Sequence, residues 1–256
     1  MTKNELQQSL KDFISGKRVY FLWSGGDDSN LLMKIILDFN LYKECNLTVV
    51  TVPFPQHVYS EMKIEKCTHY LSELGIDFKL LYTKKEISQD INYTDTCPTC
   101  KIIRREKFLE YYLPQKKDGD TILTGHNLSD LMSYYVEQCI IQLELHNISS
   151  SNRFLEISNK FLRTYDAGNG LYIHRPLLDF SENEIHSFFI ENVHSQIQIL
   201  SQKCIWSAQR KRLLQEYFVK ANIISSFGHV KNLFEKNFGI PSLDEFRNIS
   251  FETYLV

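Results

Sequence analysis

A glycine-containing hexapeptide between two apolar runs of different periodicity constrains the fold of this chain most. Residues 18–23 (RVYFLW) have the composition of a buried strand, and residues 30–39 (NLLMKIILDF) place apolar side chains at helical spacing. The hexapeptide between them is SGGDDS, at residues 24–29. Adjacent glycines accept a positive φ and let the backbone approach a ligand closely. The pattern predicts a strand, a tight turn and a helix in direct succession.

Strand and helix patterns then alternate along the chain. Strands are predicted at 47–54, 77–82, 121–124 and 171–173, and helices at 3–14, 57–74, 97–112, 128–145 and 205–221. Ser181 and Glu184 form a capping box, which predicts a helix beginning at Ser181. Residues 154–166 show no clear pattern, whereas Gly168 and Gly170 indicate a turn. This alternation predicts an α/β fold with a parallel sheet and right-handed crossovers.

The length of 256 residues suits one large domain with extensions. We divide the chain into an N-terminal helix at 1–17, a core domain at 18–180 and a helical C-terminal region at 181–256. No apolar run approaches the roughly 20 residues that cross a bilayer, and the polar start lacks the pattern of a signal peptide. We therefore expect a cytoplasmic protein without a membrane segment.

The net charge of −2 gives no global argument for binding nucleic acid. Locally, residues 97–117 hold six Lys or Arg against two Glu, and residues 203–220 hold five against one. Such stretches are typical of solvated helix faces as well as of surfaces that bind anions. Both readings stay open.

The SGGDDS turn suits a phosphate group. Backbone N–H groups of Gly25, Gly26 and Asp27, the N-terminus of the following helix and the hydroxyls of Ser24 and Ser29 would form an anion cradle. A bare carboxylate would repel phosphate, so we expect the second aspartate, at position 28, to hold a Mg²⁺ ion there. The alternative is a plain turn with a capped helix. A Walker lysine and the GxGxxG spacing are both absent from this part of the sequence.

Two motifs resemble those of the PP-loop ATP pyrophosphatases, which split ATP into AMP and pyrophosphate while adenylating a substrate. SGGDDS resembles their SGGxDS signature, and TGHNLSD at 124–130 resembles their TGHxxDD signature. Ser129 replaces the first acidic residue of that signature, and Asn127 stands at a variable position. The resemblance implies a Rossmann-like domain that uses ATP and Mg²⁺, with Gly125 and His126 at the nucleotide and Asp130 as a second Mg²⁺ ligand. A purely structural role for His126 stays open.

Cys97 and Cys100 form a CPTC motif, which we expect to head the helix at 97–112. Two thiols within one turn can share a metal centre. A helix N-terminus and the basic residues Lys101, Arg104 and Arg105 would lower the thiol pKa values. The motif alone does not separate zinc, an iron–sulfur cluster and a redox dithiol.

The wider segment CPTCKIIRREKF resembles the CxxCxxxRR segment of the tRNA 2-thiocytidine synthetases, which is shared in outline with the tRNA 2-thiouridine synthetases. HRPL at 174–177 resembles their RPL strand, and Cys204 stands where their second CxxC begins, with Ser207 replacing the second thiol. The resemblance implies that Cys97, Cys100 and Cys204 hold a 4Fe-4S cluster with one iron open to a hydrosulfide. A zinc site stays the alternative. The remaining cysteines lie in apolar patterns and are expected in the core: Cys45, Cys67 and Cys139.

The resemblance as a whole implies a sulfurtransferase that adenylates a carbonyl oxygen and replaces it with sulfur. A tRNA pyrimidine is the expected substrate, and catalysis would fall to the cluster cysteines with Asp28 and Asp130. Arg104, Arg105 and Arg175 are the candidates for contacting substrate phosphates. Three alternatives stay open: a small-molecule nucleobase or other carbonyl substrate, a PP-loop amide ligase with structural zinc, and a nucleotide-binding protein without activity. The sulfur donor and the oligomeric state, including a homodimer, stay open as well.

Overall fold

The computed structural model describes most of the first 181 residues and a few positions beyond them. The described residues are 3–53, 61–82, 93–145, 162–168, 170–181, 183–185, 187, 229–230, 232–233 and 236. For residues 3, 61, 93–101 and 137–145 only the backbone is described. The helix predicted at 205–221 lies outside these residues, as does most of the proposed C-terminal region.

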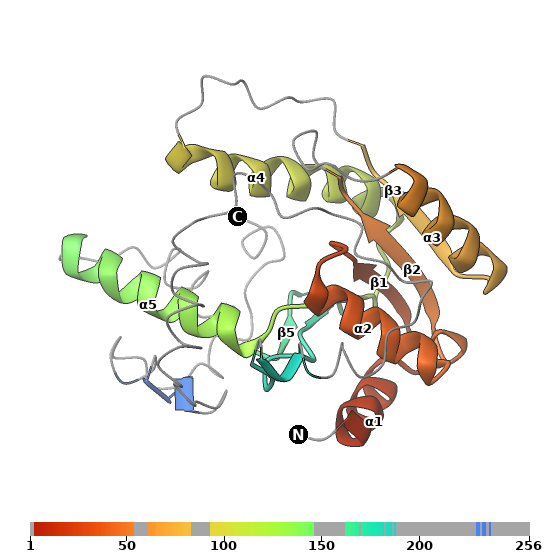
Figure 1. Ribbon diagram of the computed structural model, residues 1–256, viewed down its shortest axis with the longest axis horizontal. Coiled ribbons are helices and arrows are strands. Elements are labelled where there is room, and N and C mark those ends of the chain that lie inside the picture. Colours follow the sequence, from red (N-terminus) through yellow and green to blue (C-terminus); the bar gives the residue numbers. More distant parts are fainter. Residues whose placement is uncertain are drawn as a thin grey trace.

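The described strands form one sheet (Figure 1). They are β1 (Arg18–Leu22), β2 (Asn46–Thr51), β3 (Asp77–Leu80), β4 (Thr121–Thr124), β5 (Thr164–Asp166) and β6 (Tyr172–His174). Their order across the sheet is β3-β2-β1-β4-β6-β5. All neighbours are parallel except β5 and β6, which are antiparallel. The predicted α/β fold with a parallel sheet is confirmed, with one antiparallel strand added at its edge.

The helices follow the predicted order. They are α1 (Lys3–Ile14), α2 (Asp27–Asp38), α3 (Glu61–Glu73), α4 (Tyr93–Tyr112) and α5 (Leu128–Leu145), with short 3-10 helices η1 (Leu41–Lys43) and η2 (Leu113–Gln115). The bounds of α1 and α5 agree with the prediction. The predicted start of a helix at Cys97 is wrong, because α4 begins four residues earlier and continues past Pro98. The CPTC motif therefore lies in the second turn of α4, although a proline there removes one backbone hydrogen bond.

Helices cover both faces of the sheet, because successive side chains of a strand point to opposite faces. In β1, Val19 and Phe21 belong to a core cluster that includes side chains of α1, α2 and α3. Tyr20 belongs to a second cluster that includes side chains of α4 and α5. Burying one large apolar side chain contributes about 1.5–3 kcal/mol, so both clusters hold the sheet in place. In Figure 1, α1 and α2 lie at the lower right, whereas α4 and α5 lie at the top and the left.

Strands β5 and β6 pair as a hairpin that the sequence pattern does not predict in full. Strand β5 lies within the stretch for which no structure was assigned, and it pairs with β6 through Tyr165 and Ile173. The predicted turn between them is confirmed, because Gly168 and Gly170 have φ values of 83° and 68°. Three-residue strands carry too little periodicity to be recognised from sequence alone.

The capping box after the sheet is also confirmed. The Ser181 N–H donates to Glu184 Oε2 at 2.7 Å, and the Glu184 N–H donates to Ser181 Oγ at 3.4 Å. Residues 183–185 are helical, as the motif predicts.

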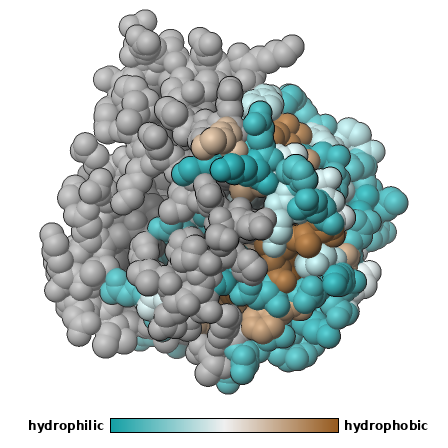
Figure 2. Space-filling model, turned by 45° about the vertical axis from the view of Figure 1, so that its right-hand side comes forward, coloured by the Kyte–Doolittle hydropathy of each residue, from teal (hydrophilic) through white to brown (hydrophobic). Residues whose placement is uncertain are grey.

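The described surface is mainly hydrophilic, with apolar areas lying between polar ones on the face shown in Figure 2. Its exposed large apolar side chains belong to Met62, Tyr82, Ile102 and Leu113. Scattered apolar side chains of this kind are normal on globular proteins. Among the described helices, none has the length and apolarity needed to span a membrane.

Candidate phosphate-binding site

The SGGDDS turn joins the carboxyl end of β1 to the N-terminus of α2. Gly25 has a φ of 72°, a conformation that a residue with a Cβ adopts only at a cost. Gly26 is the N-cap of α2 and has an ordinary φ of −87°. The two glycines of the motif therefore have different roles, and only the first one uses a positive φ.

Two serine hydroxyls brace the turn. Ser24 Oγ and Ser29 Oγ lie 3.0 Å apart, and the Gly26 N–H donates to Ser24 Oγ at 3.3 Å. Ser29 Oγ also donates to the Gly26 carbonyl at 3.0 Å. The first N–H groups of a helix have no partner within the helix and carry a partial positive charge. The turn consequently presents a helix N-terminus suited to an anion, and phosphate binding there stays a prediction.

A buried amide behind the turn was missed by the sequence analysis. Asn30 is 0% exposed, accepts a hydrogen bond from Trp23 Nε1 at 2.7 Å and donates one to the Gly25 carbonyl at 3.3 Å. Thr51 Oγ1 in β2 donates to the Trp23 carbonyl at 2.7 Å. These bonds tie the turn to two strands. The available signal was a lone asparagine that opens an otherwise apolar helical run.

A second loop, from Gly125 to Asp130, lies beside the first. Strands β1 and β4 are parallel neighbours and Leu22 pairs with Thr124, so their carboxyl ends meet at the same edge of the sheet. A Cβ added to Gly125 would lie 3.0 Å from the Ser29 backbone nitrogen, which is closer than side chains normally tolerate. A glycine at this position therefore lets the two loops touch.

Asn127 connects the two loops. Its Nδ2 donates to Asp28 Oδ1 at 3.0 Å, and its Oδ1 accepts a hydrogen bond from the Asp130 N–H at 2.9 Å. The Asn127 N–H donates in turn to Asp130 Oδ2 at 3.2 Å. The two residues predicted to bind Mg²⁺ thus both contact Asn127: the Asp28 carboxylate accepts from its side-chain amide, and the Asp130 carboxylate accepts from its backbone N–H. Their metal role stays a prediction, as does a nucleotide contact of His126, which is exposed and whose Nδ1 lies 2.9 Å from Thr124 Oγ1.

The side chains of the three cysteines predicted to bind a cluster are not among the described ones. Cys97 and Cys100 lie in residues 93–101 of α4, for which only the backbone is described, and Cys204 lies outside the described residues. Within the described side chains, no group of three or more His, Cys, Asp or Glu is arranged to hold a metal ion. The three cysteines are not among these side chains, and their shared metal site stays a prediction.

The other cysteines agree with a core role where they are described. Cys67 is 0% exposed, and burial raises the pKa of the Cys45 thiol to about 11. The Cys45 thiol therefore stays protonated near neutral pH and is a poor nucleophile and metal ligand. The side chain of Cys139 lies outside the described part.

The three arginines predicted to contact substrate lie in different surroundings. Arg104 and Arg105 are partly exposed on α4, within reach of solvent. Arg175 is 2% exposed, and its Nη1 donates to the Leu162 carbonyl at 2.6 Å. A phosphate contact by Arg175 stays a prediction, but its burial and its bond to Leu162 favour a role in holding together the open end of the β5–β6 hairpin.

Comparison with known proteins shows which family the chain resembles. Residues 1–196 match the family model of the PP-loop domain. A tRNA-cytidine(32) 2-sulfurtransferase of Marinomonas sp. is 26% identical over 198 residues, which is 72% of this chain and 62% of that protein. A protein of the same name from Haemophilus ducreyi is 26% identical over 131 residues, or 46% of this chain and 37% of that protein. The chain thus spans less than two thirds of the length of these curated relatives.

A solved structure has the same fold. The U34-tRNA thiolase NcsA from Methanococcus maripaludis, determined with its 4Fe-4S cluster, is 19% identical, with a TM-score of 0.62. The likeness covers 93% of this chain and 77% of that one, and at this identity it shows the fold alone. The family match covers most of the chain and includes both loops at the carboxyl ends of β1 and β4. The chain therefore belongs to the PP-loop domain family.

Proposed function

We propose that this chain uses ATP to activate a carbonyl oxygen of a tRNA pyrimidine and replaces that oxygen with sulfur. The observation that carries the ATP part is the contact between the SGGDDS turn and the Gly125–Asp130 loop. Both loops stand at the carboxyl edge of a parallel sheet, where ligands of such folds bind. The sulfur part is supported by the relatives, which are named as tRNA sulfurtransferases.

The described residues suit a nucleotide with its metal ion. The positive φ of Gly25 and the N-terminus of α2 provide N–H donors for phosphate oxygens. Asp28 and Asp130 supply carboxylate oxygens, which Mg²⁺ prefers, from the two loops that Asn127 joins. A Mg²⁺ ion held there would neutralise charge on the phosphates.

The proposed reaction consists of two successive displacements. The carbonyl oxygen attacks the α-phosphorus of ATP, the bond to pyrophosphate breaks, and the substrate carbon becomes activated by an AMP group. A hydrosulfide then attacks that carbon, the bond from the carbon to the former carbonyl oxygen breaks, and AMP leaves with that oxygen. The sulfur loses its proton to solvent as the thiocarbonyl forms. The protein contributes by holding the reactants in place and by neutralising the phosphate charge.

The sulfur step would rest on Cys97, Cys100 and Cys204. Thiolates are the usual ligands of iron–sulfur clusters, so the donor set fits a 4Fe-4S cluster. Three cysteines leave one iron without a protein ligand, and a bound cluster would supply a site for inorganic sulfide there. Zinc is the other metal that such thiolates bind.

Anaerobic purification followed by iron, sulfide and zinc analysis tests this proposal. We expect about four irons per chain in the wild type, a large loss in Cys204→Ala and an unchanged content in Cys45→Ala. We also expect pyrophosphate release from ATP that depends on added tRNA. A colourless protein with one zinc per chain would contradict the sulfur step and favour an amide ligase.

A small-molecule nucleobase or other carbonyl compound is the second candidate substrate. The net charge of −2 favours it, because dedicated nucleic-acid binders usually carry a basic surface. Pyrophosphate release without tRNA, in the presence of free pyrimidine nucleosides or nucleotides, would support this alternative over tRNA.

A further inference from the structure

Asn127 has a buried side chain whose two ends face different partners. It is 0% exposed, in the turn between β4 and α5. The Asp130 N–H can only donate, so it requires the amide oxygen, and the Asp28 carboxylate can only accept, so it requires the amide nitrogen. Both neighbours therefore agree on one orientation of the amide.

One of these contacts is a helix cap. Asn127 precedes α5, its Oδ1 accepts from the N–H three residues later, and Asp130 reaches back to the Asn127 N–H. This reciprocal pair is a capping box, and it stabilises the first turn of α5. Serine and aspartate serve about as well as asparagine at the N-cap, so capping alone does not require an asparagine.

The other contact does require an amide donor. Asn127 Nδ2 reaches Asp28, a residue 99 positions away and the second residue of α2. A serine is shorter, and an aspartate would add a negative charge next to a carboxylate. Gly125 permits the close approach of the two loops on which this reach depends, because any Cβ there would crowd Ser29. The close approach of the loops at Gly125 and the amide donor of Asn127 thus together fix the contact with Asp28.

We propose that Asn127 is a positioning residue whose amide holds the Asp28 carboxylate in the orientation that binds the Mg²⁺ of ATP. The inference rests on the proposed metal role of Asp28. One oxygen of that carboxylate is fixed by a neutral donor, which limits rotation of the group without competing for charge. Groups that orient metal ligands in this way typically change metal affinity by about 10–100-fold when removed.

The test uses Asn127→Ser, which keeps the cap and removes the amide donor, beside Asn127→Ala, which removes both. ATP affinity is measured by calorimetry on the full chain with Mg²⁺ and with EDTA, and Mn²⁺ binding is followed by electron paramagnetic resonance. We expect Asn127→Ser to keep its Tm within about 2 °C of wild type and to lose about tenfold in Mn²⁺ affinity. ATP binding in EDTA should not change.

Asn127→Ala should show the same loss of metal affinity together with a Tm lower by about 3 °C. Wild-type Mn²⁺ affinity in Asn127→Ser would overturn the inference. Asp28→Asn separates this from the proposed function. If Asp28→Asn loses Mn²⁺ affinity and Asn127→Ser does not, only the positioning role fails. If Asp28→Asn also keeps wild-type affinity, the metal role of Asp28 fails and the inference with it.

Discussion

Gly25 and Gly26 are adjacent in the SGGDDS turn, yet their backbone conformations differ. Gly25 has a φ of 72°, whereas Gly26 has a φ of −87° and could carry a Cβ that meets only Ser24 Oγ at 3.5 Å. Sequence alone cannot assign these roles, because both residues are glycines. The difference leads to a stability prediction at the scale of single residues.

Gly25→Ala should lower the free energy of unfolding by about 1–2 kcal/mol, since alanine pays the cost of a positive φ. Gly26→Ala should change it by less than about 0.5 kcal/mol, because the new Cβ makes an ordinary contact. Urea unfolding of the ATP-free protein measures both. Equal losses in the two variants would show that φ does not decide the difference.

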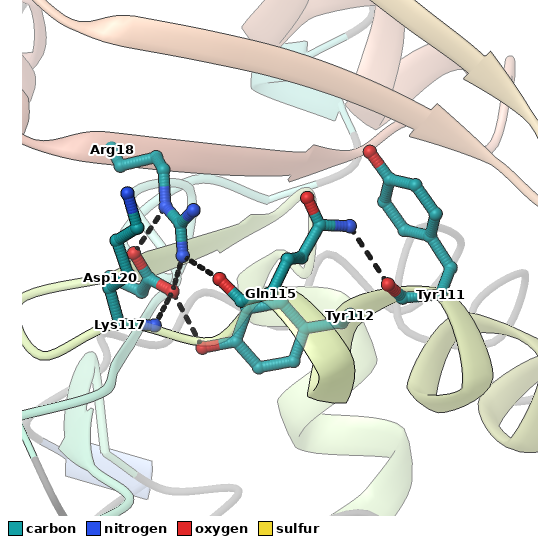
Figure 3. A network of polar contacts seen from close by, with 6 residues as sticks. All are labelled: Arg18, Tyr111, Tyr112, Gln115, Lys117 and Asp120. Atoms are coloured by element: carbon teal, nitrogen blue, oxygen red, sulfur yellow. Dashed lines mark hydrogen bonds and ion pairs between the residues drawn. The ribbon is translucent and has the colours of Figure 1, made fainter.

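A buried carboxylate joins β1 and α4 to the start of β4 (Figure 3). It lies at the amino-terminal edge of the sheet, opposite the edge that carries the SGGDDS turn. Asp120, 1% exposed, precedes β4 and accepts two hydrogen bonds from Arg18 of β1, at 2.7 and 2.6 Å. Tyr112 of α4 and the Lys117 N–H donate to it as well. Burial would raise the pKa of Asp120, but these hydrogen bonds outweigh it and hold the pKa below its usual value.

Asp120→Asn should therefore lower the free energy of unfolding by about 3 kcal/mol, because Arg18 loses its charged partner and one amide oxygen cannot replace two carboxylate oxygens. ATP affinity should stay unchanged, since the network lies at the far edge from the phosphate turn. Asp118→Asn, at an exposed neighbouring position, is the matched control and should change stability by less than about 0.5 kcal/mol. Thermal unfolding and ATP calorimetry decide the outcome.

Helix α1 meets β6 through an imidazole ring. His174 is 3% exposed, stacks on Phe13 with ring centroids 3.9 Å apart and shares a hydrogen bond with Thr164 through Nδ1 at 2.8 Å. Burial above all, together with the nearby positive charges of Arg163, Lys17 and Arg175, lowers the pKa of His174 to about 3. The folded protein therefore keeps this imidazole neutral at pH values at which an unfolded chain protonates it.

The lowered pKa of His174 in the folded state makes the protein less stable as the pH decreases. Below about pH 6.5 the unfolded state binds a proton at His174 that the folded state does not bind. Between pH 7 and pH 5 this one group should cost the wild type about 2 kcal/mol. His174→Phe keeps a ring against Phe13 and removes the titration, so its stability should fall by about 2 kcal/mol less over the same range. Urea unfolding at both pH values gives the comparison, and parallel pH profiles would contradict it.

On the scale of the whole molecule, a near-neutral chain that binds tRNA needs a local basic surface. Arg104 and Arg105 lie on α4, which packs on the sheet face opposite to α1. Each phosphate contact releases counterions, so the affinity for RNA falls with salt in proportion to the number of contacts. The salt dependence of binding thus reports on the surface that tRNA uses.

Replacing Arg104 and Arg105 together by Gln should reduce the slope of log affinity against log salt by about 1.5, whatever the sequence of the tRNA. Lys11→Gln on α1 is the control on the other face and should leave the slope unchanged. Filter binding over a range of salt concentrations measures all three proteins. An unchanged slope in the double variant would remove these arginines from the interface, and salt-insensitive binding by the wild type would count against a tRNA substrate.

Local chemistry made much of the fold predictable. The bounds of α1, α5 and β4, the turn at Gly168 and the capping box at Ser181 depend on periodicity or on contacts between near neighbours in sequence. The predicted start of α4 at Cys97 is wrong. The position of a helix end depends on several small energetic contributions, which a short motif does not reveal. Strand β5 was missed, since three residues carry no readable period and only pairing with β6 makes them a strand.

Side-chain spacing and glycines within a few residues of one another are enough to predict the alternating architecture and the turn at SGGDDS. The contacts that complete this turn depend on the folded chain. Asn30 is held by Trp23, and Asn127 reaches Asp28 across 99 residues of chain. The contact between Asn127 and Asp28 exists only after β1 and β4 pair in parallel, which brings their carboxyl ends together at one edge of the sheet.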